Sequence, residues 1–373
     1  MKRKIIEVSS DSNIGGAGKC LITLLKNFDY DKFDVKVVVP SQSLLKPEIE
    51  SLGVPVIEIP SIAEKSLDIK AITVLWKLFR YEKPDLVHTH ASMSARIAAH
   101  LAGAKVVYTR HSVFPPSKRL STFPGKQING FINNHYSDGI IAVAEAAKDN
   151  LTDTGINPEK IRVILNGVDA LESIPQAEKA LIRERFGVND GERVISIVAR
   201  LEDIKGHNYF IEAAKMLIDD GINAKFIIAG TGSYEKALKE KVKRFKLEDK
   251  IIFTGFITDV DKLMNITDIQ VNASYGTEAT SLALLEGMSI GVPAVVSNFG
   301  GNPGVIKDGV NGFVVAKQNS AALKKGIERL LCDDELYDEM SLRCKEVFSE
   351  TFTSVAMTRK TEDMYTDVIE RKM

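Results

Sequence analysis

Residues 269–297 read IQVNASYGTEATSLALLEGMSIGVPAVVS, and this stretch decides the fold class. A short apolar run at 269–274 leads through a polar turn into an apolar helical pattern, and a second apolar run follows at 293–298. Neither run alternates between apolar and polar residues, as expected for strands that are covered on both faces. A strand, a helix and a strand in this order predict a βαβ unit in a parallel sheet.

The same pattern recurs along the whole chain of 373 residues. Two series of strands that alternate with helices predict an α/β protein with two Rossmann-like, doubly wound parallel-sheet domains. A chain of this length is also long for a single core. The runs expected as strands are 4–9, 35–40, 54–59, 85–90, 105–110 and 139–144 in the first half, and 194–199, 225–230, 250–255, 269–274, 293–298 and 312–316 in the second.

Composition predicts where the two domains meet. Residues 171–193 carry Pro, Gly and dense charge but no strand pattern, so they are expected to connect the domains. The amino-terminal domain would then span 1–170 and the carboxy-terminal domain 194–350. Residues 351–373 contain a helical pattern with no strand after it.

Charge and cysteine content exclude several classes of protein. The formal net charge of -1 gives no basic footprint for nucleic acid. Cys20, Cys332 and Cys344 form no CxxC pair, so neither a disulfide framework nor a zinc site is indicated. The basic start has too short an apolar run for a signal peptide, and no run approaches the ~18 apolar residues of a spanning helix. These features predict a cytoplasmic protein.

The helix of the opening stretch contains an acid where apolar residues are expected. Glu286 lies among leucines, and an ionised carboxylate is rarely buried without a partner. Thr280 or Ser281 can cap this helix, and Gly291 can end it. Glu278 stands eight residues before Glu286, which is roughly 12 Å along a helix. Paired glycosidase carboxylates sit only about 5–9.5 Å apart, so the spacing favours two ends of one long ligand.

Glycines and basic residues follow several predicted strands, where open α/β sheets bind ligands. Gly15 and Gly16 precede a helical pattern and can bring backbone N–H groups to a phosphate. Arg200 and Lys205 flank a loop after the first strand of the second half, and this pair suits a diphosphate. Gly230 forms another turn, but it is not part of a GxGxxG motif, so a nicotinamide dinucleotide site is not supported.

Three blocks in this order resemble the retaining glycosyltransferases of family 4, which have the GT-B architecture. The resemblance covers essentially the whole chain. The blocks are the Gly15–Gly16 pair, ARLEDIKGH at 199–207, and Glu278 and Glu286 followed by GVPAVVSNFGGNPGVIKDGVNGFVV.

The resemblance implies that residues 194–350 bind a nucleotide-diphosphate sugar, with a UDP-sugar favoured over a GDP-sugar. Arg200 and Lys205 would hold the diphosphate, Glu286 the ribose, and Glu278 the donor sugar. His111 would lie beside the transferred sugar. The implied donor-binding set is Gly15, Gly16, Arg200, Lys205, Gly230, Phe256, Ile257, Glu278, Ser281, Leu282 and Glu286. The implied catalytic set is His111, Arg200, Lys205 and Glu278.

The resemblance further implies that a hexosyl or N-acetylhexosaminyl group moves with retention, without metal or cofactor, to a glycan, lipid-linked or small-molecule hydroxyl. Such a reaction would serve cell-surface polysaccharide synthesis. Residues 1–170 would face the acceptor, and the helix in 351–373 would cross back to them. Ala279 and Thr280 depart from the family pattern and leave the donor sugar open. A nucleotide-sugar epimerase and a non-catalytic sugar-nucleotide-binding module remain alternatives.

Two further patterns could suggest a metal. Asp259 and Asp261 form a DxD, but they precede a helical pattern and are expected to cap it. His88, His90 and His111 lie at strand ends without a carboxylate at helical spacing. A turn or acceptor-site role is therefore favoured over metal binding.

Residues 105–137 contain no Asp or Glu but several basic residues, with Phe114, Phe123 and Phe131 between them. In the family this region faces the acceptor. Arg110, Lys118 and Arg119 are therefore candidates for contact with an anionic acceptor or with lipid headgroups at the inner face of a membrane. A solvated loop surface is the alternative.

Overall fold

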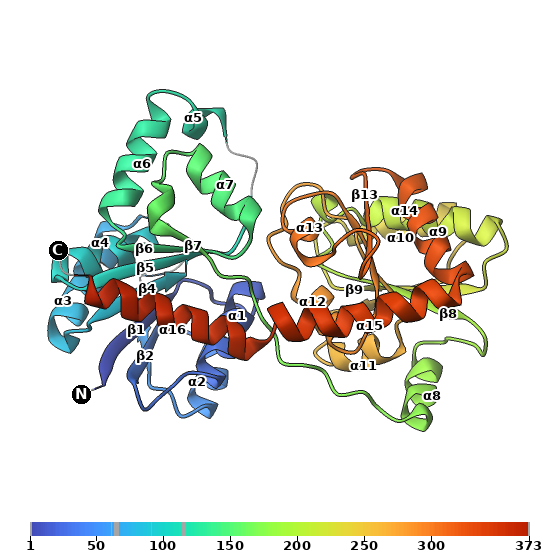
Figure 1. The fold of residues 1–373 in the computed structure, drawn as a ribbon, viewed down its shortest axis with the longest axis horizontal. Helices are drawn as coiled ribbons and strands as arrows, with labels where there is room; N and C mark the ends of the chain where they lie inside the picture. Colours follow the sequence, from blue (N-terminus) through green and yellow to red (C-terminus); the bar gives the residue numbers. More distant parts are fainter. Residues whose placement is uncertain (1, 61, 63–66, 91, 114–116, 372–373) are drawn as a thin grey trace. The chain divides into compact units, whose positions relative to one another are not determined.

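The computed structural model describes residues 2–60, 62, 67–90, 92–113 and 117–371. The chain divides into two compact units, and each contains one parallel sheet with helices (Figure 1). Unit 1 comprises Met1–Val168 and Ser354–Met373, and unit 2 comprises Asp169–Thr353. The predicted α/β class with two doubly wound parallel sheets is confirmed.

The sheet of unit 1 has the order β3-β2-β1-β4-β5-β6-β7, and every pair is parallel. The order reverses between β1 and β4, which makes the carboxyl ends of these two strands the topological switch point. The strands are β1 (Arg3–Ser9), β2 (Phe33–Pro40), β3 (Val56–Ile59), β4 (Leu86–His90), β5 (Lys105–Arg110), β6 (Gly139–Ala142) and β7 (Ile161–Val163).

Successive side chains of a strand point to opposite faces of the sheet, and in these strands the side chains on both faces are apolar. Helices therefore cover both faces of the sheet. Ile5 of β1 packs into one apolar cluster, and its neighbour Ile6 packs into another. The helices of unit 1 are α1 (Gly16–Lys26), α2 (Leu45–Ser51), α3 (Ile69–Glu82), α4 (Met93–Ala102), α5 (Lys118–Ser121), α6 (Gly125–His135), α7 (Glu145–Asp153), the 3₁₀ turn η1 (Pro158–Lys160) and α16 (Ser354–Glu370).

The last helix, α16, belongs to unit 1 although the chain passes through unit 2 before reaching it. Met364, Tyr365 and Val368 of this helix are buried in the same cluster as Leu21 and Leu25 of α1. Among the described residues, no helix combines the length and the apolar character that crossing a membrane requires.

Unit 2 has a six-stranded parallel sheet of order β10-β9-β8-β11-β12-β13. Its strands are β8 (Arg193–Val198), β9 (Ala224–Ala229), β10 (Ile251–Gly255), β11 (Ile269–Asn272), β12 (Ala294–Ser297) and β13 (Gly312–Val315). Its helices are α8 (Gln176–Arg185), the 3₁₀ turn η2 (Asp203–Lys205), α9 (His207–Asp219), α10 (Glu235–Arg244), α11 (Val260–Ile266), α12 (Leu282–Ser289), α13 (Asn302–Val305), α14 (Ser320–Cys332) and α15 (Asp334–Thr351).

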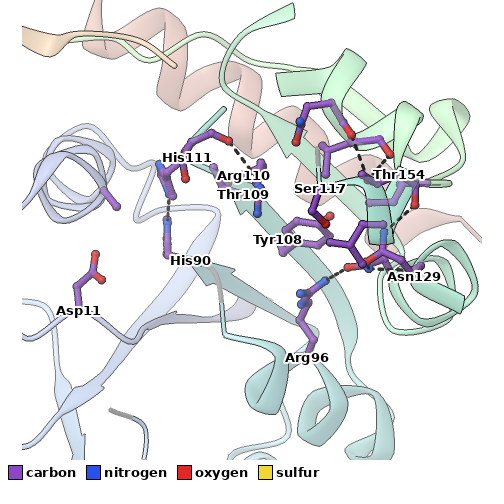
Figure 2. A pocket seen from close by; sticks show the side chains of 17 residues that line it. Asp11, His90, Arg96, Tyr108, Thr109, Arg110, His111, Ser117, Asn129 and Thr154 are labelled. Carbon is purple, nitrogen blue, oxygen red and sulfur yellow. Dashed lines mark hydrogen bonds between the residues drawn. The ribbon is translucent and has the colours of Figure 1, made fainter. Parts of the chain in front are cut away.

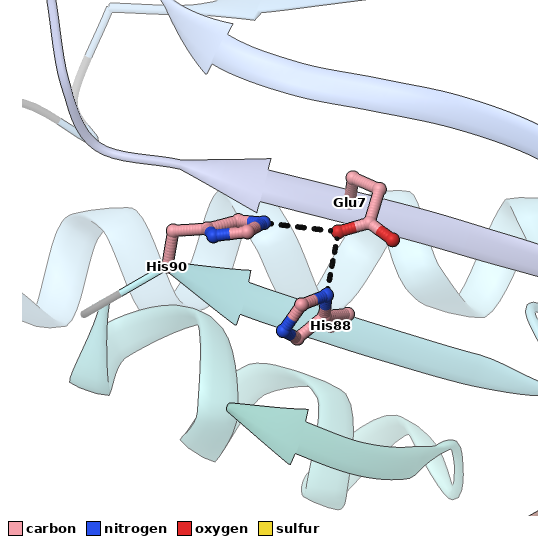
Figure 3. A group of neighbouring side chains, drawn as sticks. All are labelled: Glu7, His88 and His90. Carbon is pink, nitrogen blue, oxygen red and sulfur yellow. Dashed lines mark hydrogen bonds and ion pairs between the residues drawn. The ribbon is translucent and has the colours of Figure 1, made fainter. Parts of the chain in front are cut away.

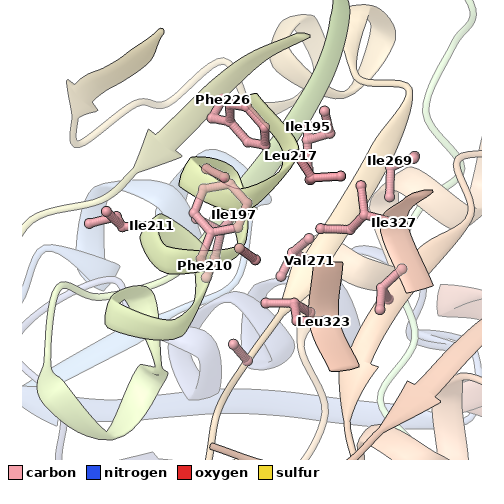
Figure 4. Close-up of a cluster of buried hydrophobic side chains, with 14 of the residues drawn as sticks. Ile195, Ile197, Phe210, Ile211, Leu217, Phe226, Ile269, Val271, Leu323 and Ile327 are labelled. Carbon is pink, nitrogen blue, oxygen red and sulfur yellow. The ribbon is translucent and has the colours of Figure 1, made fainter. Parts of the chain in front are cut away.

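The largest apolar cluster of unit 2 joins its central strands to α9 and α14 (Figure 4). Phe210 of α9 and Phe226 of β9 are fully buried and meet edge to face. Ile327 of α14 packs into the same cluster. Residues of β8 and β11 belong to this core, and the loops that follow these strands carry Arg200, Lys205 and Glu278.

Each run expected as a strand is a strand in the structure, and the helix predicted in the carboxy-terminal tail is α16. One strand was not predicted: β7 covers only three residues at the edge of the sheet of unit 1. Residues 171–193 contain the helix α8, which packs against α11 within unit 2.

Candidate active site

In unit 2 the basic motif residues lie in the loop after β8, at the carboxyl end of a central strand. Arg200 is exposed, and its guanidinium pairs with Glu202 at 2.8 Å. Lys205 ends the short turn η2, and Gly206 follows it with φ +76°. A Cβ at Gly206 would lie 2.1 Å from the carbonyl oxygen of Ala273, so glycine alone lets this loop approach β11 so closely.

The ammonium of Lys205 contacts the loop after β11. Its Nζ donates to the carbonyl oxygen of Thr277 at 2.9 Å and to Oε2 of Glu278 at 3.1 Å. An ammonium has three donors, so two of them are used by these partners. Both charged side chains are nearly buried, with 12% and 8% of their side-chain area exposed. The structure therefore brings Lys205 and Glu278 together, two residues that the sequence places 73 positions apart.

Glu278 is held by neutral donors as well. Asn272 Nδ2 and Ser274 Oγ each donate to its Oε2 at 3.0 Å. Its backbone carbonyl accepts from the N–H of Gly301, while Gly300, with φ +57°, packs against it. The carboxylate is therefore fixed in one orientation before any ligand arrives, which is what a positioned binding group requires.

The helix α12 starts directly after this loop. Ser281 is its N-cap, and its hydroxyl accepts from the N–H of Leu284, as predicted. The helix ends at Ser289, and Gly291 follows with φ +88°, also as predicted. Glu286 is partly exposed on α12, and Leu282 occupies its first turn. The acid inside an apolar helix therefore lies at the boundary of the core.

The residues expected near the nucleotide base follow β10. Phe256 is 69% exposed, and Ile257 packs partly against an apolar cluster. The N–H of Gly230, after β9, donates to the carbonyl oxygen of Gly255 at 2.9 Å. A Cβ at Gly230 would lie 2.1 Å from the carbonyl oxygen of Ala199, so this turn packs directly on the loop that carries Arg200.

The expected helix cap at the DxD sequence is only partly right. Asp259 occupies the N-cap position of α11, but its side chain makes no capping hydrogen bond. Instead its carboxylate pairs with Arg185 of α8 at 3.1 Å. Hydrogen bonding to its own backbone N–H, more than the nearby Arg185, lowers the pKa of Asp259.

In unit 1 the predicted glycines open α1. Gly15 is the N-cap of α1 and Gly16 its first residue, and a Cβ at either would meet no atom within 4 Å. The space beside this helix start is thus open to a ligand. A Cβ at Gly18 would instead lie 2.7 Å from Leu45, so packing against α2 accounts for that glycine.

His111 follows β5 and continues a chain of hydrogen bonds into the sheet. Its Nε2 lies 2.7 Å from Nδ1 of His90, whose Nε2 lies 3.1 Å from Oε2 of Glu7. Nδ1 of His88 lies 2.8 Å from the same carboxylate oxygen (Figure 3). Tyr365 of α16 donates to the other oxygen, Oε1, at 2.6 Å.

The strand register explains this cluster, which the sequence analysis did not predict. Glu7 of β1 pairs with His88 of β4, and Ser9 pairs with His90. The histidines therefore do have a carboxylate partner, contributed by the neighbouring strand rather than by helical spacing. The ligand atoms of Glu7, His88 and His90 lie within 4.8 Å of one another, so this group could hold a metal ion. The sequence did contain a signal for this cluster: Glu7 lies within an apolar strand, and His88 and His90 alternate in another strand.

Burial controls the charges in this cluster. Burial would raise the pKa of Glu7, but His88 and His90 outweigh it, and the pKa lies well below its usual range. Burial, reinforced by His90 and His88, holds the pKa of His111 well below 6.5. Burial also lowers the pKa of His88 and raises that of Tyr365. The cluster thus contains an ionised Glu7 that accepts hydrogen bonds from the side chains around it.

A pocket of about 510 Å³ opens beside His111 within unit 1 (Figure 2). Arg110 lines it, and its Nε donates to the carbonyl oxygen of Ser112 at 3.1 Å. Lys118 and Arg119 lie exposed on α5 and do not line this pocket, although their neighbours Ser117 and Leu120 do. Phe114 lies outside the described residues.

Two family models match the chain in succession. Residues 14–170 match the model described as Glycosyltransferase Family 4, and residues 178–347 match the model described as Glycosyl transferases group 1. The chain belongs to glycosyltransferase family 4. The predicted family is confirmed, and the protein is a glycosyltransferase.

Full-length relatives of this glycosyltransferase are known. It is 29% identical, over its whole length and 98% of the other chain, to UDP-Gal:alpha-D-GlcNAc-diphosphoundecaprenol alpha-1,3-galactosyltransferase of Escherichia coli. HepE of Anabaena, solved in complex with UDP and glucose, is 22% identical with a TM-score of 0.86 over 98% of this chain and 99% of that one. A glycosyltransferase from Rickettsia africae matches over both complete chains at 21% identity and a TM-score of 0.85. These structures establish the GT-B fold.

Proposed function

We propose that this glycosyltransferase transfers a hexosyl or N-acetylhexosaminyl group from a UDP-sugar, with retention and without a metal, to an acceptor hydroxyl. The observation that carries this proposal is the contact between Lys205 and Glu278 beside the capped start of α12. A UDP-sugar is favoured over a GDP-sugar because the structural relative HepE binds UDP and glucose and the E. coli relative is named for UDP-Gal.

The donor diphosphate would bind at the carboxyl end of the sheet of unit 2. Lys205 has a third donor beyond the two used by Thr277 and Glu278, and Arg200 is exposed in the same loop. As the sugar–phosphate bond breaks, negative charge grows on the leaving diphosphate. These two cations and the N–H groups at the start of α12 would stabilise that charge. Gly15 and Gly16 would offer backbone N–H groups to the distal phosphate from unit 1.

The remaining donor contacts would follow the length of the nucleotide. Glu286, partly exposed on α12, would accept hydrogen bonds from the ribose hydroxyls. The base would rest near Phe256 and Ile257. Glu278 would meet the donor sugar, and His111 would lie beside the transferred sugar. The acceptor hydroxyl would arrive on the face that the diphosphate leaves, which retains configuration.

The acceptor is proposed to be a glycan or a lipid-linked molecule in cell-surface polysaccharide synthesis. The E. coli relative is named for an acceptor attached to diphosphoundecaprenol. In unit 1, Lys118 and Arg119 lie on α5, and Phe123 and Phe131 nearby are 82% and 71% exposed. Basic and aromatic side chains together suit the surface of an anionic membrane, so the enzyme would bind its inner face peripherally.

A thermal-shift panel of nucleotides and nucleotide sugars tests the donor site. A ligand that binds only the folded chain raises the melting temperature by mass action. UDP and UDP-sugars should raise it more than GDP, and Glu286→Ala should weaken UDP binding roughly tenfold. Glu335→Ala, an exposed acid on α15, is the control and should bind UDP normally. Absence of a shift with every nucleoside diphosphate would refute the proposal.

Product analysis separates transfer from the other activities that this architecture supports. Turnover should require an acceptor and persist in excess chelator. Conversion of the donor sugar without acceptor would indicate an epimerase, and donor binding without turnover would indicate a binding module. Strict dependence on a divalent metal would contradict the metal-independent mechanism.

A further inference from the structure

Arg96 is a buried cation in the wall of the pocket of unit 1. It projects from α4, and only 6% of the residue is exposed. Its Nη1 donates to Oδ1 of Asn133 at 2.8 Å, and its guanidinium lies 4.1 Å from the centre of the Tyr108 ring. Burial lowers the pKa of Arg96, but a guanidinium keeps its charge in proteins.

Among the described residues, the Arg96 guanidinium has no anionic partner. Its Nε is buried and has no hydrogen-bond partner. No carboxylate of the described residues lies within ion-pair distance of the Arg96 guanidinium, whereas Lys205 in unit 2 has Glu278. An unpaired charge away from water is costly, and a partner normally compensates it. The wall of this pocket therefore presents an unsatisfied N–H donor with a positive charge.

The surroundings of Arg96 favour a negatively charged ligand over a neutral one. Arg110 lines the same pocket of about 510 Å³, together with the side chains of Ser117 and Asn129 (Figure 2). Asp11 is the acid among the described lining residues, and Figure 2 shows it on the His90 side of the pocket, away from Arg96. Arginine binds phosphate and carboxylate oxygens with its planar set of donors.

We propose that this pocket binds an oxyanion carried by the acceptor, a phosphate or a carboxylate group, with Arg96 as the buried anchor and Arg110 as the second cation. The identity of this ligand as an acceptor rests on the proposed function. The pocket lies beside His111, so an acceptor anchored by its anion would present its hydroxyl groups near that histidine. Negative charge on the acceptor is thereby a requirement of this enzyme's specificity.

Calorimetric titration of the full chain with inorganic pyrophosphate and with succinate tests the proposal. The titrations use an Arg200→Gln, Lys205→Gln background, which removes the cations of the proposed donor site. At least one probe should bind, and pyrophosphate or succinate then identifies phosphate or carboxylate as the preferred group. Arg96→Gln, which keeps an amide donor for Asn133, and Arg110→Gln should each weaken binding roughly tenfold or more. Lys77→Gln changes an exposed lysine on α3 that does not line the pocket, and it should not weaken binding.

Two results would overturn the proposal: neither probe binds, or Arg96→Gln binds both as well as the background does. Folding of each variant is checked by its thermal melting curve, and Arg96→Lys is the second variant. Lysine keeps the charge but not the planar donor set, so binding should be intermediate. UDP binding to an otherwise unchanged chain should not respond to Arg96→Gln. Loss of probe binding with normal UDP binding would identify a defect in the acceptor site, whereas loss of UDP binding would identify a defect in the donor site.

Discussion

Nε2 of His111 lies 2.7 Å from Nδ1 of His90, and the two rings are stacked with their centroids 5.0 Å apart. At this distance one of the two nitrogens donates a hydrogen bond to the other. In the tautomer of His90 that donates from Nε2 to the ionised Glu7, Nδ1 of His90 is an acceptor. His111 must then donate from Nε2, which leaves its Nδ1 as an acceptor. Glu7, two hydrogen bonds away through His90, thus sets the tautomer of His111, the histidine proposed to lie beside the sugar.

The pH dependence of transfer should reflect this arrangement. The pKa of His111 lies well below 6.5 because of burial and then of His90 and His88. If neutral His111 is required, kcat should stay constant down to pH 6.5 and fall only in more acidic solution. His90→Phe removes a neighbour that lowers this pKa, so the acid limb of the pH–rate profile should move upward. If the acid limb of the pH–rate profile stays at the same pH in His90→Phe, then His90 does not set the pKa of His111.

A second histidine should make unit 2 sensitive to acid. His207 is buried, and burial followed by Lys205 lowers its pKa to about 4. Below pH 6.5 the unfolded chain takes up a proton here that the folded chain does not, so stability falls until about pH 4. The expected loss is about 3 kcal/mol. Urea unfolding of His207→Leu should show a flatter pH dependence; the same slope would exclude His207 as the cause.

Removing either partner of the Lys205–Glu278 pair should affect stability and activity differently. Lys205→Gln leaves a nearly buried carboxylate without its cation and should cost about 3 kcal/mol. The double variant Lys205→Gln, Glu278→Gln has no unpaired charge, so most of that loss should be recovered. Its transfer activity should remain at least a hundredfold below that of the native enzyme, in line with loss of a transition-state contact. If the double variant recovered both its stability and its transfer activity, the Lys205–Glu278 pair would have a purely structural role.

Membrane binding should depend on α5. The double charge reversal Lys118→Glu, Arg119→Glu should reduce flotation with anionic vesicles, because each basic residue near such a surface contributes about 1 kcal/mol. Lys243→Glu, Arg244→Glu on α10 of unit 2 reverses two exposed charges elsewhere and serves as the control. Equal flotation of both variants and the native chain would leave α5 as a solvated surface.

Most of the fold was predictable, because buried parallel strands have a simple apolar pattern. The three residues of β7 escaped detection since so short a run carries no pattern of its own. The motif residues Lys205 and Glu278 were identified by resemblance, but their direct contact depends on how the loops after β8 and β11 approach each other. Local sequence does not specify such an approach, although Gly206 makes it sterically feasible.

The sites that the sequence analysis missed depend on contacts between segments far apart in the chain. Glu7 meets His88 and His90 through the register of two strands about 80 residues apart. Nothing in the local sequence marks Arg96, and its burial without an acid partner among the described residues is what distinguishes it. Asp259 was expected to cap α11, but its side chain makes no capping hydrogen bond and pairs with Arg185 of α8 at 3.1 Å.

The helix α16 also imposes an order on biosynthesis. Tyr365 donates to Glu7 across a separation of 358 residues, and Met364 and Val368 fill the core beside it. A ribosome therefore makes all of unit 2 before it makes the helix that covers this part of unit 1. Until α16 has been synthesised, the apolar residues that it covers and the carboxylate of Glu7 lack their contacts with this helix. Chaperones that bind exposed apolar segments have their longest opportunity at this face.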